Sequence, residues 1–163
     1  YADVIADLDT ILLDTRKTIP VYRHLAKYAT RMGGATNHRM ALDDGVLIKD
    51  NHVAVSGGIS EAIKRAQAAK LPNIEVECDT LDQVKEAIEA GADMILFDNM
   101  SSETMVEAVA IVAGQVPTEA SGDVNLETIR AKAETGVTHI SVGRLTHSAP
   151  AVNIGLDWSA QTS

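Results

Sequence analysis

Basic and imidazole side chains gather beside short apolar runs in the first third of the chain. The segments run from Asp14 to Pro20, from Asn37 to Arg39 and from Leu47 to His52. Four fixed positive charges and two adjustable donors result: Arg16, Lys17, Arg39 and Lys49, with His38 and His52. Like charges repel in one cleft, so a polyanionic small ligand explains their clustering better than stability does. The alternative is that they are ordinary solvated charges at loop edges.

A pair of carboxylates follows two later apolar runs. Glu77 and Asp98 fall at the ends of predicted strands 74–78 and 94–97, so both should point into one mouth. Such a pair suits a divalent cation such as Mg²⁺, which prefers carboxylate and phosphate oxygens, or the hydroxyls of a ribose. The alternative is that Glu77 is a surface acid and Asp98 caps a loop. Glu75 shares a strand face with Glu77, so spacing does not separate their roles.

Small residues after the last two predicted strands suit a phosphate. Ser121-Gly122 and Gly143 would let a phosphate approach the backbone, because glycine has no side chain in the way. Structural turns would explain the same glycines. His147 follows in a polar loop, as a donor or as a packed loop histidine.

Length, charge and composition narrow the class of protein. The 163 residues carry a net charge of −9 and are 45% hydrophobic but only 3% aromatic, which predicts one domain with an aliphatic core. The acidic balance argues against nucleic-acid and membrane partners. Without a signal-like start or an apolar run of ~20 residues, we expect a cytoplasmic protein. Cys78 is the only cysteine, so no intrachain disulfide can form. Because it lies inside an apolar strand-like run, we expect its thiol to be buried.

Strand-like and helix-like runs alternate along the chain. Predicted strands cover 11–13, 45–48, 74–78, 94–97, 118–120 and 139–143, and predicted helices cover 21–31, 60–69, 80–91, 103–112 and 126–134. This order predicts a parallel sheet covered by helices. A full barrel needs ~250 residues, so residues 11–163 should form an incomplete parallel, TIM-like α/β barrel of about six βα units, or an open sheet. Residues 1–10 are predicted to be a connecting segment.

Taken together, the motifs resemble one enzyme family. The segments that carry the likeness are Asp14 to Thr18, Gly33-Gly34, Asn37 to Arg39, Leu47 to His52, Glu75 to Glu77, Asp98 to Met100, Ser121-Gly122, Ser141 to Gly143, Leu145 to Pro150 and Ile154 to Asp157. Residues 11–157 resemble quinolinate phosphoribosyltransferase, also called nicotinate-nucleotide pyrophosphorylase (carboxylating). The resemblance implies transfer of phosphoribose from phosphoribosyl pyrophosphate to quinolinate with loss of carbon dioxide, giving nicotinate mononucleotide in NAD biosynthesis.

The resemblance also implies a role for each site residue. By this resemblance, the two carboxylates of quinolinate are recognised by Arg16, His38, Arg39 and Lys49. The 5′-phosphate is matched to Ser121, Gly122 and Gly143, and Lys17 is matched to the phosphoribosyl pyrophosphate side. His147 is placed among the substrate-binding residues. Glu77 and Asp98 are matched to the ribose hydroxyls and Mg²⁺. The catalytic set is therefore Lys17, Lys49, Glu77 and Asp98.

Some features depart from the family pattern. In the family, an N-terminal domain precedes the barrel and a neighbouring subunit's copy covers the site, but nothing in this chain corresponds to it. Asp123 stands where glycine is common, Arg144 where a small residue is usual, and Val21-Tyr22 replaces a glycine-containing turn. The alternatives are a binding domain without turnover and a related molybdenum-associated barrel enzyme. Uncovered sheet edges and apolar surface would favour a homo-oligomer, a dimer or higher.

Overall fold

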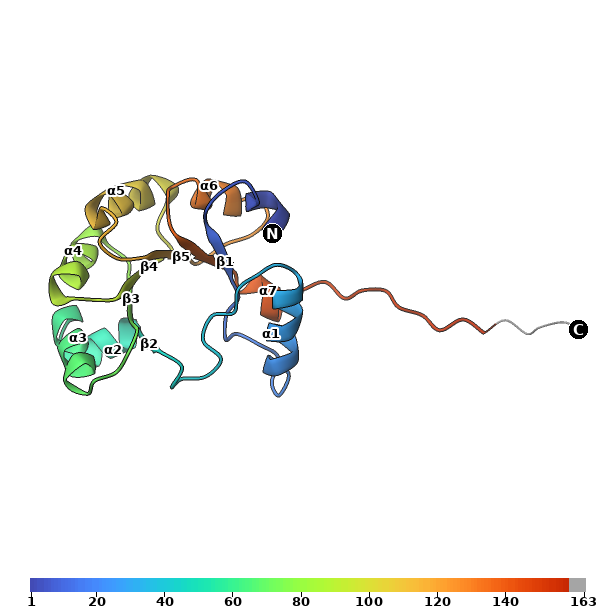
Figure 1. Cartoon of the computed structure of the whole chain (residues 1–163), viewed down its shortest axis with the longest axis horizontal. Helices are drawn as coiled ribbons and strands as arrows, with labels where there is room; N and C mark the ends of the chain where they lie inside the picture. The colour runs from blue at the N-terminus through green and yellow to red at the C-terminus, as the bar shows by residue number, and fades with distance from the viewer. Residues whose placement is uncertain (159–163) are drawn as a thin grey trace, which may run out of the picture.

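The computed structural model describes residues 1–158 and forms an incomplete α/β barrel. Strands line the inside of an open ring and helices cover its outside (Figure 1). The strands are β1 (Ile11–Leu13), β2 (Val46–Ile48), β3 (Ile74–Cys78), β4 (Met94–Asp98), β5 (Thr118–Ser121) and β6 (His139–Ser141). The helices are η1 (Ala2–Ile5), α1 (Arg23–Met32), α2 (Asp50–Ser56), α3 (Ile59–Ala68), α4 (Leu81–Ala90), α5 (Ser102–Val112), α6 (Ile129–Ala133) and α7 (Arg144–His147).

All pairings in the sheet are parallel. The strand order is β1-β6-β5-β4-β3-β2, so β1 and β2 are its two edges and the ring stays open between them. A single parallel bridge joins Leu13 to Thr36 beyond β1. The incomplete parallel barrel predicted from the alternating runs is thereby confirmed. Parallel pairing brings the carboxyl ends of the strands to one rim, where a ligand site is expected.

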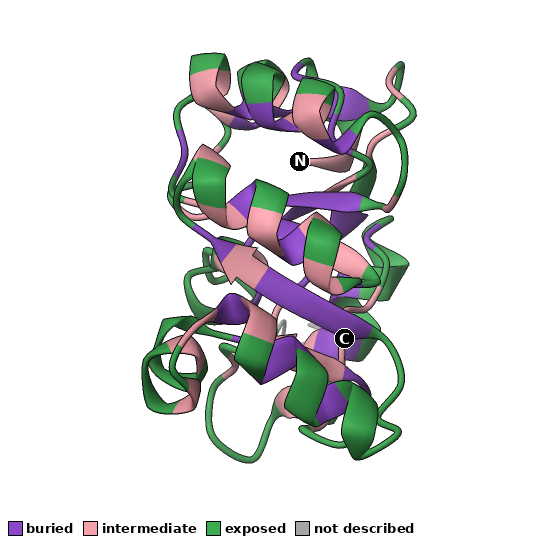
Figure 2. Ribbon diagram, turned by 90° about the vertical axis from the view of Figure 1, so that its left-hand side faces the viewer, coloured by how far each residue is buried: buried purple, intermediate pink, exposed green. Residues whose placement is uncertain are grey.

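Aliphatic side chains fill the space between sheet and helices. The buried core lies along the strands and the inward faces of the helices (Figure 2). Phe97 is fully buried. The other large hydrophobic side chains that are fully buried in the core are mostly Ile and Val. Cys78 is also fully buried, as predicted, and burial with nearby carboxylates raises the pKa of its thiol to about 12. Cys78 should therefore be unreactive, because the thiolate is the form of cysteine that reacts.

Helix boundaries differ from expectation where the backbone takes positive φ. Helix α1 begins at Arg23, two residues later than predicted, because Val21 has φ +71°. Helix α3 begins at Ile59 with Gly58 at its N-cap, so Ser60 is inside the helix and does not cap it. Positive φ interrupts a helix whatever the apolar spacing.

Two short helices follow strands without having been predicted. Helix α2 follows β2 directly and helix α7 follows β6. Helix α6 is shorter than predicted, because Asn125 accepts bonds from the amides of Glu127 and Thr128 and so holds a turn before the helix. Short helices have too few turns to show an apolar period.

The first ten residues pack against α6. Ile5 is buried in the core, and Arg130 pairs with Asp7 through Nη1 at 2.5 Å and Nη2 at 2.9 Å. Arg130 also donates to the carbonyl of Val4. Residues 1–10 thus join the first strand to the outer helix layer. At the other end, residues 159–163 of the predicted domain lie outside the described residues. No helix in residues 1–158 is long and apolar enough to cross a membrane.

Candidate functional site

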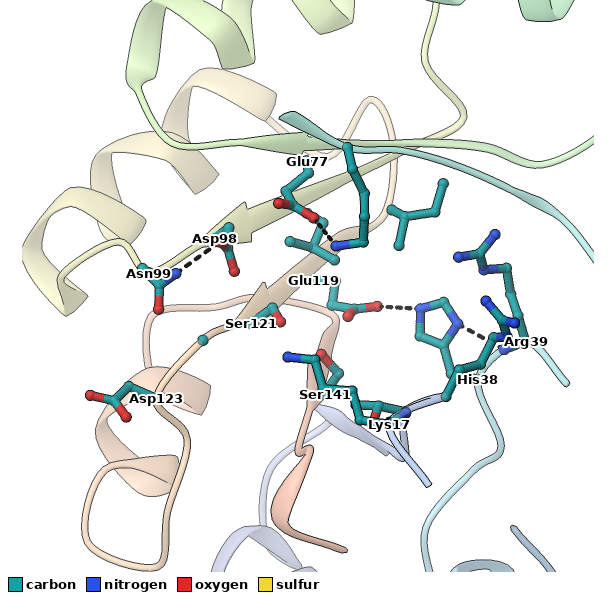
Figure 3. Close-up of a pocket in the computed structure, with 16 residues that line it drawn as sticks. Lys17, His38, Arg39, Glu77, Asp98, Asn99, Glu119, Ser121, Asp123 and Ser141 are labelled. Carbon is teal, nitrogen blue, oxygen red and sulfur yellow. Dashed lines mark hydrogen bonds and ion pairs between the residues drawn. The ribbon is translucent and has the colours of Figure 1, made fainter. Parts of the chain in front are cut away.

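A pocket of about 500 Å³ opens at the carboxyl ends of the strands (Figure 3). Every predicted site residue except His52, Gly143 and His147 lines it. The lining also includes Thr15, Leu47, Leu96, Asn99, Glu119, Asp123 and Ser141. Segments distant in sequence therefore meet in one cavity, which suits a ligand larger than an ion.

Guanidinium groups occupy one side of this pocket. Arg16 follows β1, and Arg39 follows the bridge at Thr36 and donates through Nη1 to the carbonyl of Gly45 at 2.8 Å. The Nε atoms of Arg16 and Arg39 are buried and have no hydrogen-bond partner among the described residues. Burial and the nearby Arg16 charge both lower the pKa of Arg39. Buried donors without a partner cost free energy unless a ligand satisfies them.

Lys49 and Glu77 form an ion pair across the pocket mouth. Lys49 Nζ lies 2.5 Å from Glu77 Oε2, and the lysine side chain is about half exposed (49%). Lys49 is also the N-cap of α2, and its backbone N–H donates to Nδ1 of His52. His52 therefore caps a helix and does not line the pocket, so the expectation that it is a ligand donor was wrong.

His38 lies between two buried carboxylates. Its Nε2 is 3.2 Å from Glu119 Oε2 (Figure 3). The same atom is 3.4 Å from Glu75 Oε2. Burial lowers the pKa of His38, but hydrogen bonding and charge from the two carboxylates outweigh burial and raise it to about 9. The bond from the amide of Arg39 to Nδ1 opposes protonation, because a protonated Nδ1 has no free lone pair. One imidazolium cannot balance both carboxylates, and burial raises the pKa of Glu75.

These three side chains also have the spacing of metal ligands. Their ligand atoms lie within 4.8 Å of one another. A histidine binds a metal only through a neutral ring nitrogen, however, and the raised pKa favours the cation. The arrangement is thus better suited to hold an imidazolium against the two carboxylates than to bind a metal ion.

Glycine is required where the β5 loop approaches the β4 loop. Gly122 has φ +84°, and a Cβ there would clash with Oδ1 of Asn99 and lie 2.8 Å from the backbone nitrogen of Asn99. Asn99 in turn donates to Asp98 Oδ2 at 2.8 Å. The absence of a side chain at Gly122 therefore keeps Asp98, Asn99 and Ser121 together at the pocket wall.

Gly143 and His147 lie beside the pocket lining. A Cβ on Gly143 would lie 2.8 Å from Nε2 of His147 and 3.7 Å from Cδ of Lys17. His147 is exposed, and its Nδ1 lies 2.7 Å from the hydroxyl of Ser148. The structure thus brings both residues close to Lys17, and their phosphate-binding role stays a prediction.

Sequence reasoning missed Glu119 and Ser141 as pocket residues. Glu119 is 1% exposed and lies at the centre of β5, in register with Leu96. One signal was available, since a charged residue in the middle of a strand covered on both faces needs a partner. That partner, His38, comes from a loop eighty-one positions earlier, so the pairing was not visible in the sequence.

An incomplete parallel α/β barrel with cations and carboxylates around one pocket defines the class: an α/β-barrel protein with a charged pocket at the carboxyl ends of its strands. Residues 1–157 match the family model described as quinolinate phosphoribosyl transferase, C-terminal domain. The chain belongs to this family.

Relatives in the family agree with that assignment. The chain is 49% identical over 148 residues to a probable nicotinate-nucleotide pyrophosphorylase [carboxylating] of Bacillus subtilis, covering 90% of this chain and 51% of that protein. It is 42% identical over 162 residues to the Mycobacterium leprae enzyme of that name, covering 96% and 57%. The solved nicotinate-nucleotide pyrophosphorylase of Francisella tularensis superposes with a TM-score of 0.87 at 44% identity, covering 91% and 54%. The chain spans about half the length of the relatives it matches.

Proposed function

We propose that this chain supplies the barrel of an enzyme that transfers phosphoribose from phosphoribosyl pyrophosphate to quinolinate and releases carbon dioxide. The product would be nicotinate mononucleotide, a precursor of NAD. The observation that carries the proposal is the pair of buried Nε donors, on Arg16 and Arg39, that have no partner within residues 1–158. They share a pocket with Glu77 and Asp98, which supports a site where an anion and a sugar would bind next to each other.

The cationic side of the pocket fits a dicarboxylate. Quinolinate carries two carboxylates on neighbouring ring carbons, and the planar forks of Arg16 and Arg39 match carboxylate geometry. His38, whose pKa is raised by buried Glu119 and Glu75, would add a third positive charge on this side of the pocket. A monocarboxylate would leave part of this set unsatisfied, so the site should reject it.

Positive charge develops at the sugar as the bond breaks. The pyridine nitrogen attacks C1′ while the C1′–O bond to pyrophosphate breaks, so carboxylates at Glu77 and Asp98 would stabilise the oxocarbenium-like transition state. Lys17 and Lys49 would stabilise the departing pyrophosphate. The pyridinium nitrogen then lets the C2 carboxylate leave as carbon dioxide, with the bonding electrons kept at C2, where a proton adds.

The pocket carboxylates also suit Mg²⁺. Glu77 and Asp98 offer carboxylate oxygens, the kind of ligand that Mg²⁺ prefers. Oε2 of Glu77 pairs with Lys49, and Oδ2 of Asp98 accepts a hydrogen bond from Asn99. The ion would neutralise charge on the pyrophosphate of the substrate. Ser121, Gly122, Gly143 and His147 would hold the 5′-phosphate.

Calorimetry joined to a product assay tests this proposal. Quinolinate is titrated into the chain with and without phosphoribosyl pyrophosphate and Mg²⁺, and nicotinate mononucleotide is assayed in parallel. We expect quinolinate to bind and nicotinate, with its single carboxylate, to bind far more weakly. No heat with quinolinate would overturn the carboxylate site.

A binding domain without turnover is the second candidate, and Asp123 favours it. Asp123 lines the pocket next to Gly122, where its negative charge opposes a phosphate. Its φ of +51° is one that glycine adopts more easily. We expect Asp123→Gly to tighten phosphoribosyl pyrophosphate binding, measured by calorimetry. Quinolinate binding with no product in the wild-type chain would support this second candidate, and turnover by the chain alone would exclude it.

The oligomeric state and location belong to the same proposal. Within residues 1–158, edge strand β2 pairs with a strand on one side only, and β1 has only the bridge to Thr36 on its outer side. Helix α1 exposes Leu25, Tyr28 and Met32. A second copy or a further domain would cover such a surface. We therefore propose that the chain forms a homo-oligomer. We also propose that it acts in the cytoplasm, because multiply charged phosphorylated substrates do not cross a membrane unaided.

A further inference from the structure

A fully buried ion pair lies directly behind the cationic side of the pocket. Asp14 follows β1 and Lys27 lies on α1, and both side chains have 0% exposure with Nζ 2.5 Å from Oδ1. Burying two charges costs so much desolvation that a hydrophobic pair often serves stability as well. Stability alone therefore does not explain why charges are placed here.

Asp14 accepts hydrogen bonds from two parts of the chain, helix α1 and the loop that holds Asn37 and His38. Its Oδ1 accepts from Lys27 Nζ and from the backbone N–H of His38 at 2.8 Å. Its Oδ2 accepts from the hydroxyl of Thr30 at 2.8 Å and the amide of Asn37 at 2.6 Å. Both lone-pair regions of each oxygen are used, so the carboxylate fixes β1, α1 and the Asn37 loop against one another.

Lys27 holds the same loop from the other direction. Its Nζ donates to the carbonyl of His38 at 2.8 Å. The backbone N–H and the backbone C=O of His38 are thus both bound to the ion pair. Bonds between the loop and β1 backbone end at Thr36, and residues 37–45 contain no helix or strand. The direction of His38 and Arg39 into the pocket therefore depends on Asp14 and Lys27.

We propose that Asp14 and Lys27 are positioning residues for the dicarboxylate side of the pocket. They fix the backbone from which His38 and Arg39 project, and Asp14 lies two positions before Arg16. Neither charge touches the pocket, since neither residue lines it. The pair acts through the substrate-binding side chains. The inference rests on the proposed function, because it concerns recognition of quinolinate.

The double variant Asp14→Asn/Lys27→Met removes both charges and leaves no unpaired one. We expect a cooperative thermal transition close to that of the wild-type chain and quinolinate affinity weaker by about tenfold or more, since small misplacements of binding groups are costly. Phosphoribosyl pyrophosphate affinity should stay unchanged. Calorimetry with each ligand measures this split, which a general loss of structure would not produce.

A milder variant keeps the test decisive if the double variant does not fold. Asn37→Ala removes one donor to Asp14 Oδ2 and leaves the ion pair, so we expect the same ligand split at a smaller size. Arg130→Gln is the control, because it breaks an ion pair on the outer surface. It should change neither affinity.

The outcomes separate the two proposals. Wild-type binding of quinolinate that neither Asp14→Asn/Lys27→Met nor Asn37→Ala weakens would overturn the positioning role and leave the proposed function standing. Parallel loss of both ligands in a folded variant would overturn it too, since positioning of one side predicts a split. A wild-type chain that does not bind quinolinate would overturn the proposed function, and this inference with it.

Discussion

Single guanidinium groups carry much of the expected affinity for the dicarboxylate. Arg39 keeps a buried Nε without a partner in the described part of the chain. We expect Arg39→Ala to weaken quinolinate binding by about 1.5 to 3 kcal/mol, the range for a hydrogen bond to a charged group. Arg39→Lys should recover only part of the loss, because it keeps the charge without the fork. Equal affinity of Arg39→Ala and wild-type chains in calorimetry would refute this role.

The proton on His38 is the second prediction at the scale of residues. Its pKa is about 9 in the folded chain and 6.5 in the unfolded reference, so protonation stabilises the fold fully below pH 6.5. This stabilisation is lost as the pH rises through about 9. Glu119→Gln removes one charge, so the pKa of His38 should fall and the loss should move to lower pH.

An NMR titration of the His38 ring measures that shift directly. Glu127→Gln is the matched control, because Glu127 is an exposed carboxylate that does not line the pocket. A His38 pKa that stays unchanged in Glu119→Gln would mean that Glu119 does not hold the proton. Thermal unfolding measured from pH 6 to 10 should give the same difference between the variants.

At the scale of elements, the turn after β5 lies in close contact with the loop after β4, where Gly122 packs against Asn99. Gly122→Ala would place a Cβ against Asn99, at a φ of +84°. Gly57→Ala provides a matched control, because Gly57 has φ +90° but nothing within 4 Å of its Cβ. Each variant pays backbone strain of about 1 to 2 kcal/mol, and only Gly122→Ala adds the clash.

Chemical denaturation and ligand titration together measure this difference. We expect Gly122→Ala to lose more stability than Gly57→Ala and to weaken phosphoribosyl pyrophosphate binding, because the clash moves Asn99 and with it Asp98. Equal losses of stability in the two variants, with ligand affinity intact, would show that the contact between the two loops tolerates a side chain.

For the whole molecule, the open ring leaves apolar surface that association would cover. Leu25, Tyr28 and Met32 lie along one side of α1 and are each more than half exposed. We expect the chain to self-associate in sedimentation velocity experiments and Leu25→Glu to reduce this association. Val106→Glu changes an exposed residue of α5 and should have little effect. A compact monomer at high concentration would contradict the prediction.

Local signals determined most elements and the side of the barrel that carries the site. Short apolar runs that alternate with helix-like segments predicted all six strands, since these patterns depend only on residues close together in the sequence. Polar residues directly after those strands predicted the pocket rim, because parallel strands place their carboxyl ends together. The order of motifs predicted the family, which the match over residues 1–157 confirms.

The tertiary structure alone decided which of those residues meet and what charge they hold. No local pattern pairs His38 with Glu119, joins Lys27 to Asp14, or directs His52 to a helix end. Such pairings depend on packing between segments far apart in sequence. Burial of carboxylates sets the pKa of His38 in the same way, because the cost of an isolated charge appears only once the core excludes water.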